Sequence, residues 1–459
     1  MDYKVPQPRS QPDEQRGTEL FMLFVKHGEE IDSLWRKTSS PYYHWKKFES
    51  AYKTDYFGNF WKSQNITAEE AWFILGIRRG FGNTKSLITD TLSKAFTWSK
   101  LPNYEKRLHD FDMQMGGNMS SDGGAKGLSN NHQRFLRQSF IEEAIASSQL
   151  EGAATTRERA KRMFAENLKP MSNGEWMIYN NYQTIKKIEE ESSKYPLSKE
   201  MLLELHITMT SRTDLDDEKI GRWRKDSDDI VVRRQVGNEY LVAHVPPVES
   251  KIEAELDKLI AFANDIDTSG QDDFIHPILK AIMIHFWFAY IHPFCDGNGR
   301  LSRSLFYWYL LRQKYWLISY VPISTVIKKS PSQYADAYSF SEQYNNDLTY
   351  FIDYNLRKIQ QALTMFEQHV ERVKEKSQEI DRLLPDKDLN SRQKQVLHHL
   401  LGKPEDGTSV TQHAQFHEIS WLTASQDIKA LKMKGYIVPQ RIGTSVIYHA
   451  TDKLKQFIE

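Results

Sequence analysis

Residues 292–303 read His-Pro-Phe-Cys-Asp-Gly-Asn-Gly-Arg-Leu-Ser-Arg, and the rest of the chain is best interpreted outward from them. The apolar run Ile278 to Tyr290 before this stretch and the run Arg300 to Leu311 within and after it both predict helices. The turn between them therefore opens onto a helix N-terminus, where free N–H groups and the helix dipole favour an anion. Gly297 and Gly299 carry no side chain that would keep a phosphate from the backbone. The stretch predicts a phosphate-binding turn between two helices.

The side chains of the same stretch supply the remaining chemistry. The imidazole of His292 titrates near neutral pH and can accept a proton from an attacking hydroxyl. The carboxylate of Asp296 is a hard oxygen ligand, suited to a phosphate-bound Mg²⁺. Arg300 and Arg303 are three residues apart on one helical face, so both guanidiniums can reach the same polyphosphate. This combination favours nucleotide chemistry over a helix-breaking turn with solvated arginines.

At these residues the chain resembles the Fic family, whose pattern is His-x-Phe-x-Asp/Glu-Gly-Asn-Gly-Arg-x-x-Arg, and every fixed position matches. The resemblance implies transfer of AMP from ATP to a Ser, Thr or Tyr hydroxyl of a protein, with Mg²⁺ as the metal. It implies that His292 is the general base, that Asp296 holds Mg²⁺, and that Arg300 and Arg303 bind the β- and γ-phosphates. It also implies an anion hole formed by Gly297, Asn298 and Gly299.

A second match lies upstream, where Ser147-Ser148-Gln149-Leu150-Glu151-Gly152 fits the inhibitory signature Ser/Thr-x-x-x-Glu-Gly/Asn of the family. Ser147 and Glu151 are four residues apart, so both fall on one face of a helix predicted through Phe140 to Leu150. The resemblance implies that Glu151 pairs with Arg303 and keeps that arginine from the γ-phosphate. The alternative is an ordinary exposed glutamate before the helix-ending Gly152.

Two β-branched runs, Ile230 to Arg234 and Glu239 to Val245, flank a Gly237-Asn238 turn and predict a hairpin. The hairpin resembles the flap of the family, which lies over the active site and aligns the target segment by strand addition. A purely structural hairpin is the alternative. Tyr334 stands where the family often stacks an aromatic ring on adenine, and a core tyrosine is an equal alternative.

Composition restricts the setting of this chemistry. The 459 residues predict about two or three domains. Lys and Arg number 61, as do Asp and Glu, so no net charge directs the chain to nucleic acid or membrane. The single cysteine, Cys295, excludes an internal disulfide and fits a reducing compartment. No apolar run is long enough to span a bilayer, and Met1 to Arg16 is polar rather than signal-like. We expect a cytoplasmic protein without a membrane partner, and leave open whether it forms a homodimer.

The chain divides into four predicted regions within a mainly α-helical fold. Residues 1–130 form a helical region of unknown role, in which Thr67 to Gly76 and Ser86 to Trp98 have helical periodicity. Met115 to Asn131 is rich in Gly, Ser and Asn and predicts a loop. The catalytic core, with the inhibitory helix, the flap and the active-site motif, occupies residues 131–364. A helical connector over 365–388 follows.

Residues 389–459 predict three helices and a hairpin, which resembles a winged helix-turn-helix. Helices are predicted from Ser391 to Leu401, from Ser409 to Phe416 and after a cap at Ser420. If this region reads DNA, its third helix would enter the major groove. Basic residues barely outnumber acidic ones here, so DNA and a protein partner are equal alternatives.

The function that best fits these patterns is a protein adenylyltransferase, autoinhibited by Glu151. One alternative is a de-adenylylase, or an enzyme with both activities, in which Glu151 positions a water that cleaves an AMP–protein bond. A second alternative is a transcription regulator whose core only senses nucleotide.

Overall fold

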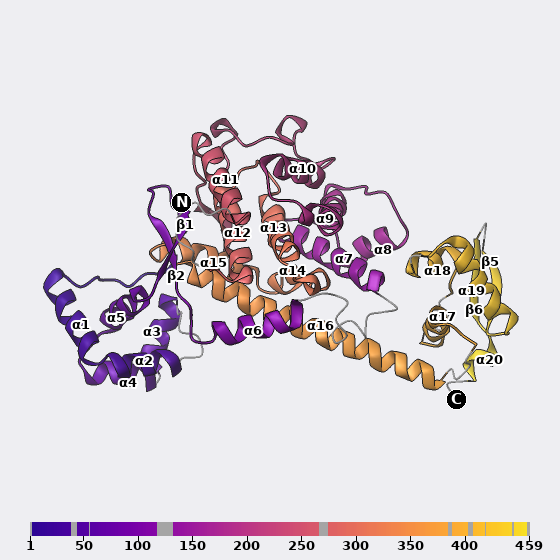
Figure 1. Ribbon diagram of the computed structural model, residues 1–459, viewed down its shortest axis with the longest axis horizontal. Helices are drawn as coiled ribbons and strands as arrows, with labels where there is room; N and C mark the ends of the chain where they lie inside the picture. The colour runs from indigo at the N-terminus through magenta and orange to yellow at the C-terminus, as the bar shows by residue number, and fades with distance from the viewer. Residues whose placement is uncertain are drawn as a thin grey trace.

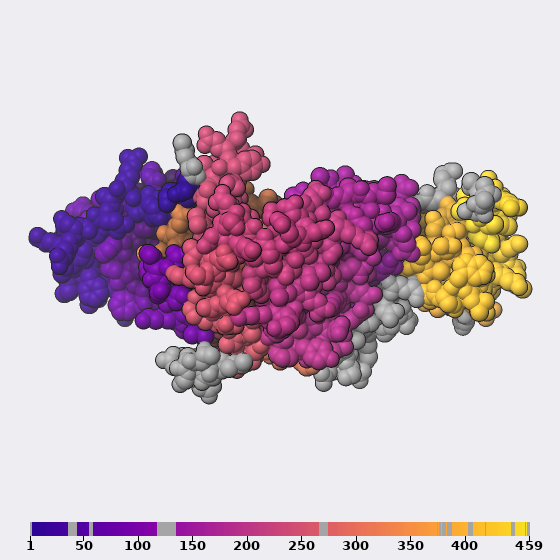
Figure 2. Space-filling model, turned by 90° about the horizontal axis from the view of Figure 1, so that it is seen from above, coloured from indigo at the N-terminus to yellow at the C-terminus, as the bar shows by residue number. Residues whose placement is uncertain are grey.

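The computed structural model describes residues 2–37, 44–54, 56–116, 132–265, 274–383, 388–402, 407–417, 419–442 and 445–456. This part of the chain is mainly α-helical, and its strands form three two-stranded antiparallel hairpins. Figure 1 shows the N-terminal helices at one end of an elongated molecule and the last helices and strands at the other, with the long α16 (Thr349–Leu383) between them. The same order is seen from above in Figure 2.

The N-terminal region is built from short helices around a buried aromatic cluster that includes Trp45, Phe48 and Trp61. Its helices are α1 (Glu14–Lys26), α2 (Gly28–Lys37), α3 (Trp45–Thr54), α4 (Tyr56–Ser63), α5 (Ala68–Gly80) and α6 (Tyr104–Met115). The helix predicted from Thr67 is confirmed as α5, which begins in a capping box between Thr67 and Glu70.

The predicted helical periodicity of Ser86 to Trp98 is wrong, because these residues form a hairpin of β1 (Thr84–Thr89) and β2 (Ala95–Trp98). The carboxylate of Asp90 accepts hydrogen bonds from the N–H groups of Leu92 (2.9 Å) and Lys94 (2.8 Å). Such a side-chain-closed turn competes with helix formation. In β2 burial alternates, with Phe96 and Trp98 buried, and Phe96 packs on α12 (Pro277–Ile291).

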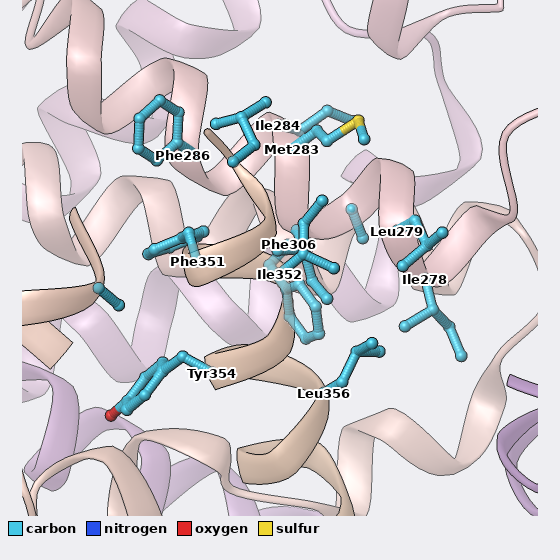
Figure 3. Packing of buried hydrophobic residues seen from close by; sticks show 14 of the residues in the cluster. Ile278, Leu279, Met283, Ile284, Phe286, Phe306, Phe351, Ile352, Tyr354 and Leu356 are labelled. Atoms are coloured by element: carbon cyan, nitrogen blue, oxygen red, sulfur yellow. The ribbon is translucent and has the colours of Figure 1, made fainter. Parts of the chain in front are cut away.

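The predicted catalytic core contains helices packed around two central ones that contact each other, α12 (Pro277–Ile291) and α13 (Asn298–Arg312). Every α12 residue from Ile278 to Phe288 is buried, which explains why this stretch is apolar except for Lys280 and His285. Figure 3 shows Ile278, Leu279, Met283, Ile284 and Phe286 of this helix beside Phe306 of α13 and Phe351, Ile352, Tyr354 and Leu356 of α16. The two helices predicted around the motif are thereby confirmed.

The other elements of this region surround these two helices. They are α7 (His132–Leu150), α8 (Arg157–Ala165), α9 (Asn173–Glu190), α10 (Lys199–Thr210), β3 (Val232–Val236), β4 (Glu239–His244), α11 (Glu249–Ala263), α14 (Ile323–Ile327) and α15 (Pro331–Gln343). The predicted hairpin at Gly237 is confirmed as β3 and β4, and Gly237 has a left-handed φ of 62°. The predicted division between residues 364 and 365 falls inside α16. Of the predicted loop at 115–131, residues 117–131 lie outside the described residues.

The C-terminal module, defined here as residues 388–456, has a hydrophobic cluster of its own that includes Leu397, Ile428 and Leu431. Its elements are α17 (Ser391–Gly402), α18 (Val410–His417), α19 (Trp421–Met433), β5 (Ile437–Ile442), β6 (Ser445–Ala450) and α20 (Asp452–Lys455). The hydroxyl of Ser420 accepts from the N–H of Thr423 (3.1 Å), as the predicted cap requires. Gly443 and Thr444, where the sequence predicts the turn of this hairpin, lie outside the described residues.

Within the described residues, none of the helices combines the length and the hydropathy needed to cross a bilayer.

Candidate active site

The structure presents His292 as a neutral base at the end of α12. The residue has a left-handed backbone (φ 49°), and its N–H donates to the carbonyl of Phe288 (3.0 Å), which closes the helix. Its Nδ1 lies 3.2 Å from the carbonyl oxygen of Ala289. A carbonyl can only accept, so Nδ1 carries the proton and Nε2 keeps its lone pair. The imidazole is therefore in the tautomer that a proton acceptor needs.

Two features keep His292 neutral. Burial lowers the pKa of its imidazole to about 4, and the positive charge of the neighbouring His244 acts in the same direction. His244, at the end of β4, directs Nδ1 to a carboxylate oxygen of Glu342 and Nε2 to the carbonyl of Tyr290, both at 2.8 Å. Burial opposes its charge, but the Glu342 carboxylate outweighs that and raises the pKa of His244. Sequence reasoning did not single out His244, because its partner is 98 residues away.

The motif turn is held in shape by the side chain of Asn298. Its amide donates to the carbonyl of Phe294 (2.8 Å) and accepts from the N–H of Phe294 (3.0 Å). Gly297, at the N-cap of α13, has a left-handed φ of 81°. The Asn298 side chain is thus committed to the turn, and the free N–H groups of the first helical turn are what the turn offers an anion.

His206 of α10 holds the motif turn in place through a hydrogen bond and a ring contact. Sequence reasoning did not identify this residue. Its Nδ1 accepts from the N–H of Gly221 (3.1 Å), so Nε2 carries the proton and donates to the carbonyl of Asp296 (3.1 Å). Its ring stacks on Phe294 with a 3.8 Å centroid separation and a 3° angle between planes. Burial lowers the pKa of His206 to about 4, so it acts as a neutral positioning residue. A lone histidine 90 residues before its partner carries no local signal.

Asp296 and Arg300 form an ion pair at the mouth of the turn. A carboxylate oxygen of Asp296 accepts from Nη2 of Arg300 (2.9 Å), and the Asp296 side chain remains 45 % exposed. Arg300 is fully buried and also donates to the carbonyl of Met209 (3.3 Å). Among the described residues no three His, Cys, Asp or Glu gather as metal ligands. A single exposed carboxylate fits Mg²⁺, which is commonly held by one or two carboxylates together with substrate phosphates and water.

The structure brings Ser147, Glu151 and Arg303 together. Arg303 donates from Nε to the hydroxyl of Ser147 (2.9 Å) and from Nη2 to the carbonyl of Ser147 (2.9 Å). The same Nη2 lies 2.8 Å from Oε1 of Glu151. The guanidinium is buried, which opposes its charge, but the Glu151 carboxylate outweighs this and raises the pKa of Arg303. The ion pair expected between the two sequence motifs is therefore present.

Glu151 reaches this position because residue 299 is a glycine. A Cβ built on Gly299 would lie 2.0 Å from Oε1 of Glu151, so no other residue could accept the carboxylate there without a shift. Gly152 follows with a φ of 91° and turns the chain away after α7. The carboxylate thus lies on the first turn of α13, where a phosphate would otherwise meet the helix N-terminus.

Two buried guanidinium N–H groups at the motif have no hydrogen-bond partner among the described residues. They are Nε of Arg300 and Nη1 of Arg303. An unsatisfied buried donor costs about 1–3 kcal/mol, and more when it is charged. Both lie on the helix that begins at the predicted phosphate-binding turn. Spare cationic donors of this kind fit a polyphosphate such as that of ATP.

Glu143, one turn before Ser147 on α7, was not singled out from sequence. It is buried, and its carboxylate accepts from the N–H of Ser324 (2.8 Å) and from the hydroxyl of the same residue. Burial raises the pKa of this carboxyl group. Glu143 thereby fixes α7, which carries Ser147, to the start of α14.

Tyr334 lies on α15 in a cluster of aromatic rings rather than on open surface. Its hydroxyl is 2.8 Å from Nε2 of His285 and 3.3 Å from the hydroxyl of Tyr338. Its ring also packs against Phe351. Of the two alternatives for Tyr334, these contacts favour a packing role.

The hairpin of β3 and β4 is anchored to the motif by the buried Arg224. The Arg224 guanidinium donates to the carbonyls of His292 (2.8 Å), Ile291 (3.4 Å) and Pro247, the last of which lies three residues after the end of β4. The backbone N–H of Arg224 donates to the carbonyl of Pro293 (2.8 Å). The position of the hairpin is thus coupled to the position of His292.

Comparison with known proteins shows which family this region of the chain is similar to. Residues 196–310 match the model of the Fic/DOC family. The chain is 42 % identical over 69 residues to a "Protein adenylyltransferase Fic" of Nematostella vectensis, covering 15 % of each chain. It is 30 % identical over 158 residues to a protein of the same name from Drosophila grimshawi, covering 34 % of this chain and 26 % of that one. The matches therefore span about a quarter or less of these relatives.

Solved structures similar to this one include a Fic family protein from Desulfovibrio desulfuricans, with a TM-score of 0.48 and 19 % identity over 77 % of this chain and 97 % of that one. A fragment of Fic-1 from C. elegans has a TM-score of 0.44 and 16 % identity, over 59 % of this chain and 73 % of that one. The match to the family model ends at residue 310 and so contains the whole motif from His292 to Arg303. Residues 196–310 of this chain therefore form a domain of the Fic/DOC family.

Proposed function

We propose that this chain is a protein adenylyltransferase, which transfers AMP from ATP to a Ser, Thr or Tyr hydroxyl and is held inactive by Glu151. The names of the relatives support the reaction class. The observation that carries the proposal is the 2.8 Å contact between Glu151 and Arg303 of α13, a helix whose N-terminus follows the neutral histidine base at the end of α12. Arg303 would then serve both in catalysis and in its inhibition.

In the proposed reaction, Nε2 of His292 accepts the proton of the target hydroxyl. The hydroxyl oxygen attacks the α-phosphorus in line, the bond from that phosphorus to the bridging oxygen breaks, and pyrophosphate leaves. Positioning and charge stabilisation supply most of the rate in phosphate transfer. The N-terminus of α13 and Arg303 would hold the triphosphate, and Asp296 would hold Mg²⁺, which neutralises phosphate charge when bound.

Two properties of Glu151 would inhibit the enzyme, namely its negative charge and the space that its side chain occupies. The Glu151 carboxylate lies beside Gly299 and accepts a hydrogen bond from Nη2 of Arg303. A γ-phosphate at the same guanidinium would face a like charge across a partly desolvated site, which disfavours it strongly. Productive binding of ATP therefore requires Glu151 to leave.

The test is the Glu151→Gly variant, incubated with Mg·ATP and a cell lysate and analysed by mass spectrometry for AMP adducts. We expect at least a tenfold rise in adducts over the wild type. Glu158→Gly, which changes an exposed glutamate on α8, is the matched control and should change nothing in the adducts. Equal adduct levels in the wild type and the Glu151→Gly variant would exclude the inhibitory role.

The same variant, in two further assays, separates the transferase from the de-adenylylase and from the nucleotide-sensing regulator. Oε1 of Glu151 contacts Arg303, and the side chain remains 30 % exposed, so it could also orient a water. If Glu151→Gly loses the ability to remove AMP from a modified protein, the de-adenylylase is favoured. Sequence-specific DNA binding without AMP transfer in any variant would favour the nucleotide-sensing regulator.

We further propose that the C-terminal module is a winged helix that selects a partner. Trp421 and Leu422 of α19 are 61 % and 64 % exposed, and Met433 of the same helix is 79 % exposed. Large apolar side chains on a surface are typical of protein contacts rather than of phosphate backbones. This exposure favours a protein partner over DNA.

A further inference from the structure

A large cleft lies between the helices α7 and α8 and the C-terminal module. Its volume is about 1060 Å³, and its walls come from α7, α8, α14, α16, α17 and α18. Figure 1 shows the module beside α7 and α8, with α16 passing below them. At one side the walls meet, because Nη1 of Arg137 on α7 donates to the carbonyl of Gln415 on α18 (3.5 Å). Ligand pockets have volumes of about 300–1,000 Å³ and often lie between domains, so a small molecule would fit.

The cleft is separate from the active site, although both are bounded by α7. Ile141, Ile145 and Gln149 line the cleft at intervals of four residues, so they share one face of this helix. Ser147, which accepts a hydrogen bond from Arg303, faces the active site instead. Among the described residues of the His292–Arg303 motif, none lines the cleft. A ligand in the cleft would therefore contact the inhibitory helix without occupying the phosphate-binding turn.

The walls of the cleft carry an excess of positive charge. Six of the described lining residues are lysine or arginine, and Glu142 is the only acidic one among them. The carboxylate of Glu142 is shared by Arg157 and Lys161 of α8, each at 2.5 Å, so it does not neutralise even these two cations. The whole chain has no net formal charge, which makes the excess a local property of the cleft. A cleft lined by one sign of charge attracts ions of the opposite sign.

Three of the cations have only uncharged partners. The ammonium of Lys328 donates to the side-chain oxygen of Gln149. The ammonium of Lys329 lies 3.4 Å from the sulfur of Met365, and Nε of Arg372 donates to a backbone carbonyl of its own helix (3.0 Å). No carboxylate of the described residues forms an ion pair with any of the three. Their charges are therefore left for an anion, to which lysine and arginine both donate charge-assisted hydrogen bonds.

Between these charges the cleft is lined by apolar side chains from both walls. They belong to α7, α8, α16, α17 and α18, and include Ile141, Ile145, Phe164, Phe366, Val396 and Phe416. Phe416, on the side of the module, is 45 % exposed. An apolar group placed between the two walls would be covered on two sides and would remove such surface from water, which is favourable.

We propose that this cleft binds an amphipathic anion, a small molecule with an apolar body and a phosphate, sulfonate or carboxylate group. The body lies between α7 and Phe416, and the anionic group is held by Lys328, Lys329 and Arg372. A neutral apolar molecule would leave the three cations without a counter-charge. An inorganic anion would leave the apolar walls in water. Both properties are therefore required of the ligand, and the site does not depend on the proposed transferase reaction.

The test is a fluorescence titration of the full chain with 8-anilinonaphthalene-1-sulfonate, an amphipathic anion that emits more strongly in apolar surroundings. N-phenyl-1-naphthylamine has the same rings without the sulfonate and serves as the neutral probe. We expect saturable binding of the sulfonate, at least tenfold tighter than binding of the neutral probe. Dodecyl phosphate should displace the sulfonate probe, and inorganic phosphate at the same concentration should not.

The charged contacts are tested by a variant that combines Lys328→Gln, Lys329→Gln and Arg372→Gln. It should bind the sulfonate probe at least tenfold more weakly than the wild type and the neutral probe within twofold of the wild type. The matched control changes three basic residues that are exposed and lie outside the cleft, by the substitutions Arg162→Gln, Lys186→Gln and Lys258→Gln. This control should bind both probes as the wild type does.

The apolar wall is tested by Phe416→Ala, which should weaken binding of both probes at least fivefold. Met433→Ala, which shortens a 79 % exposed side chain elsewhere in the module, should leave both unchanged. Equal affinity of the wild type for the two probes, or unchanged sulfonate binding in the variant without the three cations, would overturn the proposal. Displacement of the sulfonate probe by inorganic phosphate would also overturn it, as would displacement by Mg·ATP, which would place the probe in the active site.

Discussion

At the scale of single residues, the site depends on the protonation of two neighbouring histidines. His244 is held as a cation by Glu342 and Tyr290, and His292 is held neutral with Nδ1 on Ala289. The cation disfavours a second proton on His292. A base that is already unprotonated at neutral pH needs no further activation to accept the hydroxyl proton.

The pH profile of AMP transfer should report this arrangement. The unprotonated form of His292 is active and its pKa is lowered to about 4, so the rate in the Glu151→Gly background should be flat through neutral pH and should fall as pH decreases toward 4. His292→Ala should lose about 10²–10⁴-fold in rate while retaining ATP binding.

His244→Gln removes the cation beside His292, so the pKa of His292 should rise and the acid limb of the pH–rate profile should move to higher pH. His109→Gln, at an exposed position on α6, is the control. An unmoved limb in His244→Gln would contradict this account.

Gly299 provides a second prediction at this scale. An added Cβ would lie 2.0 Å from Oε1 of Glu151, so Gly299→Ala should displace that carboxylate and destabilise the wild type by about 1–3 kcal/mol. In the Glu151→Gly background the same substitution should cost clearly less, because the clashing atoms are gone. Thermal or denaturant unfolding of the wild type, the two single variants and the double variant gives the coupling free energy between Glu151 and residue 299. Equal costs in both backgrounds would show that Glu151 does not lie on Gly299.

At the scale of elements, α7 sets the state of the site, because it carries both Ser147 and the residues that lead to Glu151. Its position is fixed by Glu143, whose carboxylate caps α14 through Ser324. On the other side of the site, Arg224 ties the exit of β4 to the backbone of His292. The inhibitory helix and the hairpin thus meet the motif through buried polar contacts.

Loss of the Glu143 contact should therefore affect both stability and inhibition. Glu143→Ala leaves the N–H of Ser324 buried and unsatisfied, and should lower the free energy of unfolding by about 1–3 kcal/mol. Looser docking of α7 should also raise basal AMP transfer above that of the wild type. Unfolding curves and AMP incorporation are the measurements. Glu158→Gln on the exposed face of α8 should stay within about 0.5 kcal/mol of the wild type. A fully stable Glu143→Ala protein would argue against this role.

At the scale of the whole molecule, the N-terminal region and the Fic domain share one hydrophobic cluster, whereas the C-terminal module has another. Phe96 of β2 packs on Phe286 and Tyr290 of α12, so the first region supports the helix that ends at His292. The module lies beyond the end of α16 (Figure 1). Among the described residues, those assigned to the chemistry all precede α16.

A chain that ends at Glu375 should therefore fold and retain the AMP transfer of the Glu151→Gly variant within about twofold. Its separate cluster makes the C-terminal module a unit that can be removed without opening the main core. Partner choice should be lost, which pull-down of the partner by full-length and shortened chains would measure. The double substitution Trp421→Ala and Leu422→Ala in the full chain should reproduce that loss without the truncation. Collapse of AMP transfer in the shortened chain would show that the module is part of the catalytic unit.

Sequence alone determined the features that depend on local spacing. The helices around residues 292–303, the hairpin at Gly237 and the cap at Ser420 were predicted and found. The pairing of Glu151 with Arg303 was expected only from the family resemblance, and it is also present. Each rests on periodicity, on turn chemistry or on a motif long enough to be specific. The same local reasoning failed at Ser86 to Trp98, where the turn closed by Asp90 prevailed over an apparent helical period.

Tertiary structure alone decided which distant residues complete the site. His206, His244, Glu143 and Arg224 reach the motif or its neighbours across 46 to 181 residues of chain, and the start of the chain meets Gln343 across 338. Such contacts arise when helices pack and bury polar groups that must then find partners. No period or motif in the sequence encodes them. The charge on His244 and the neutrality of His292 are therefore properties of the fold, although the residues that react are visible in the sequence.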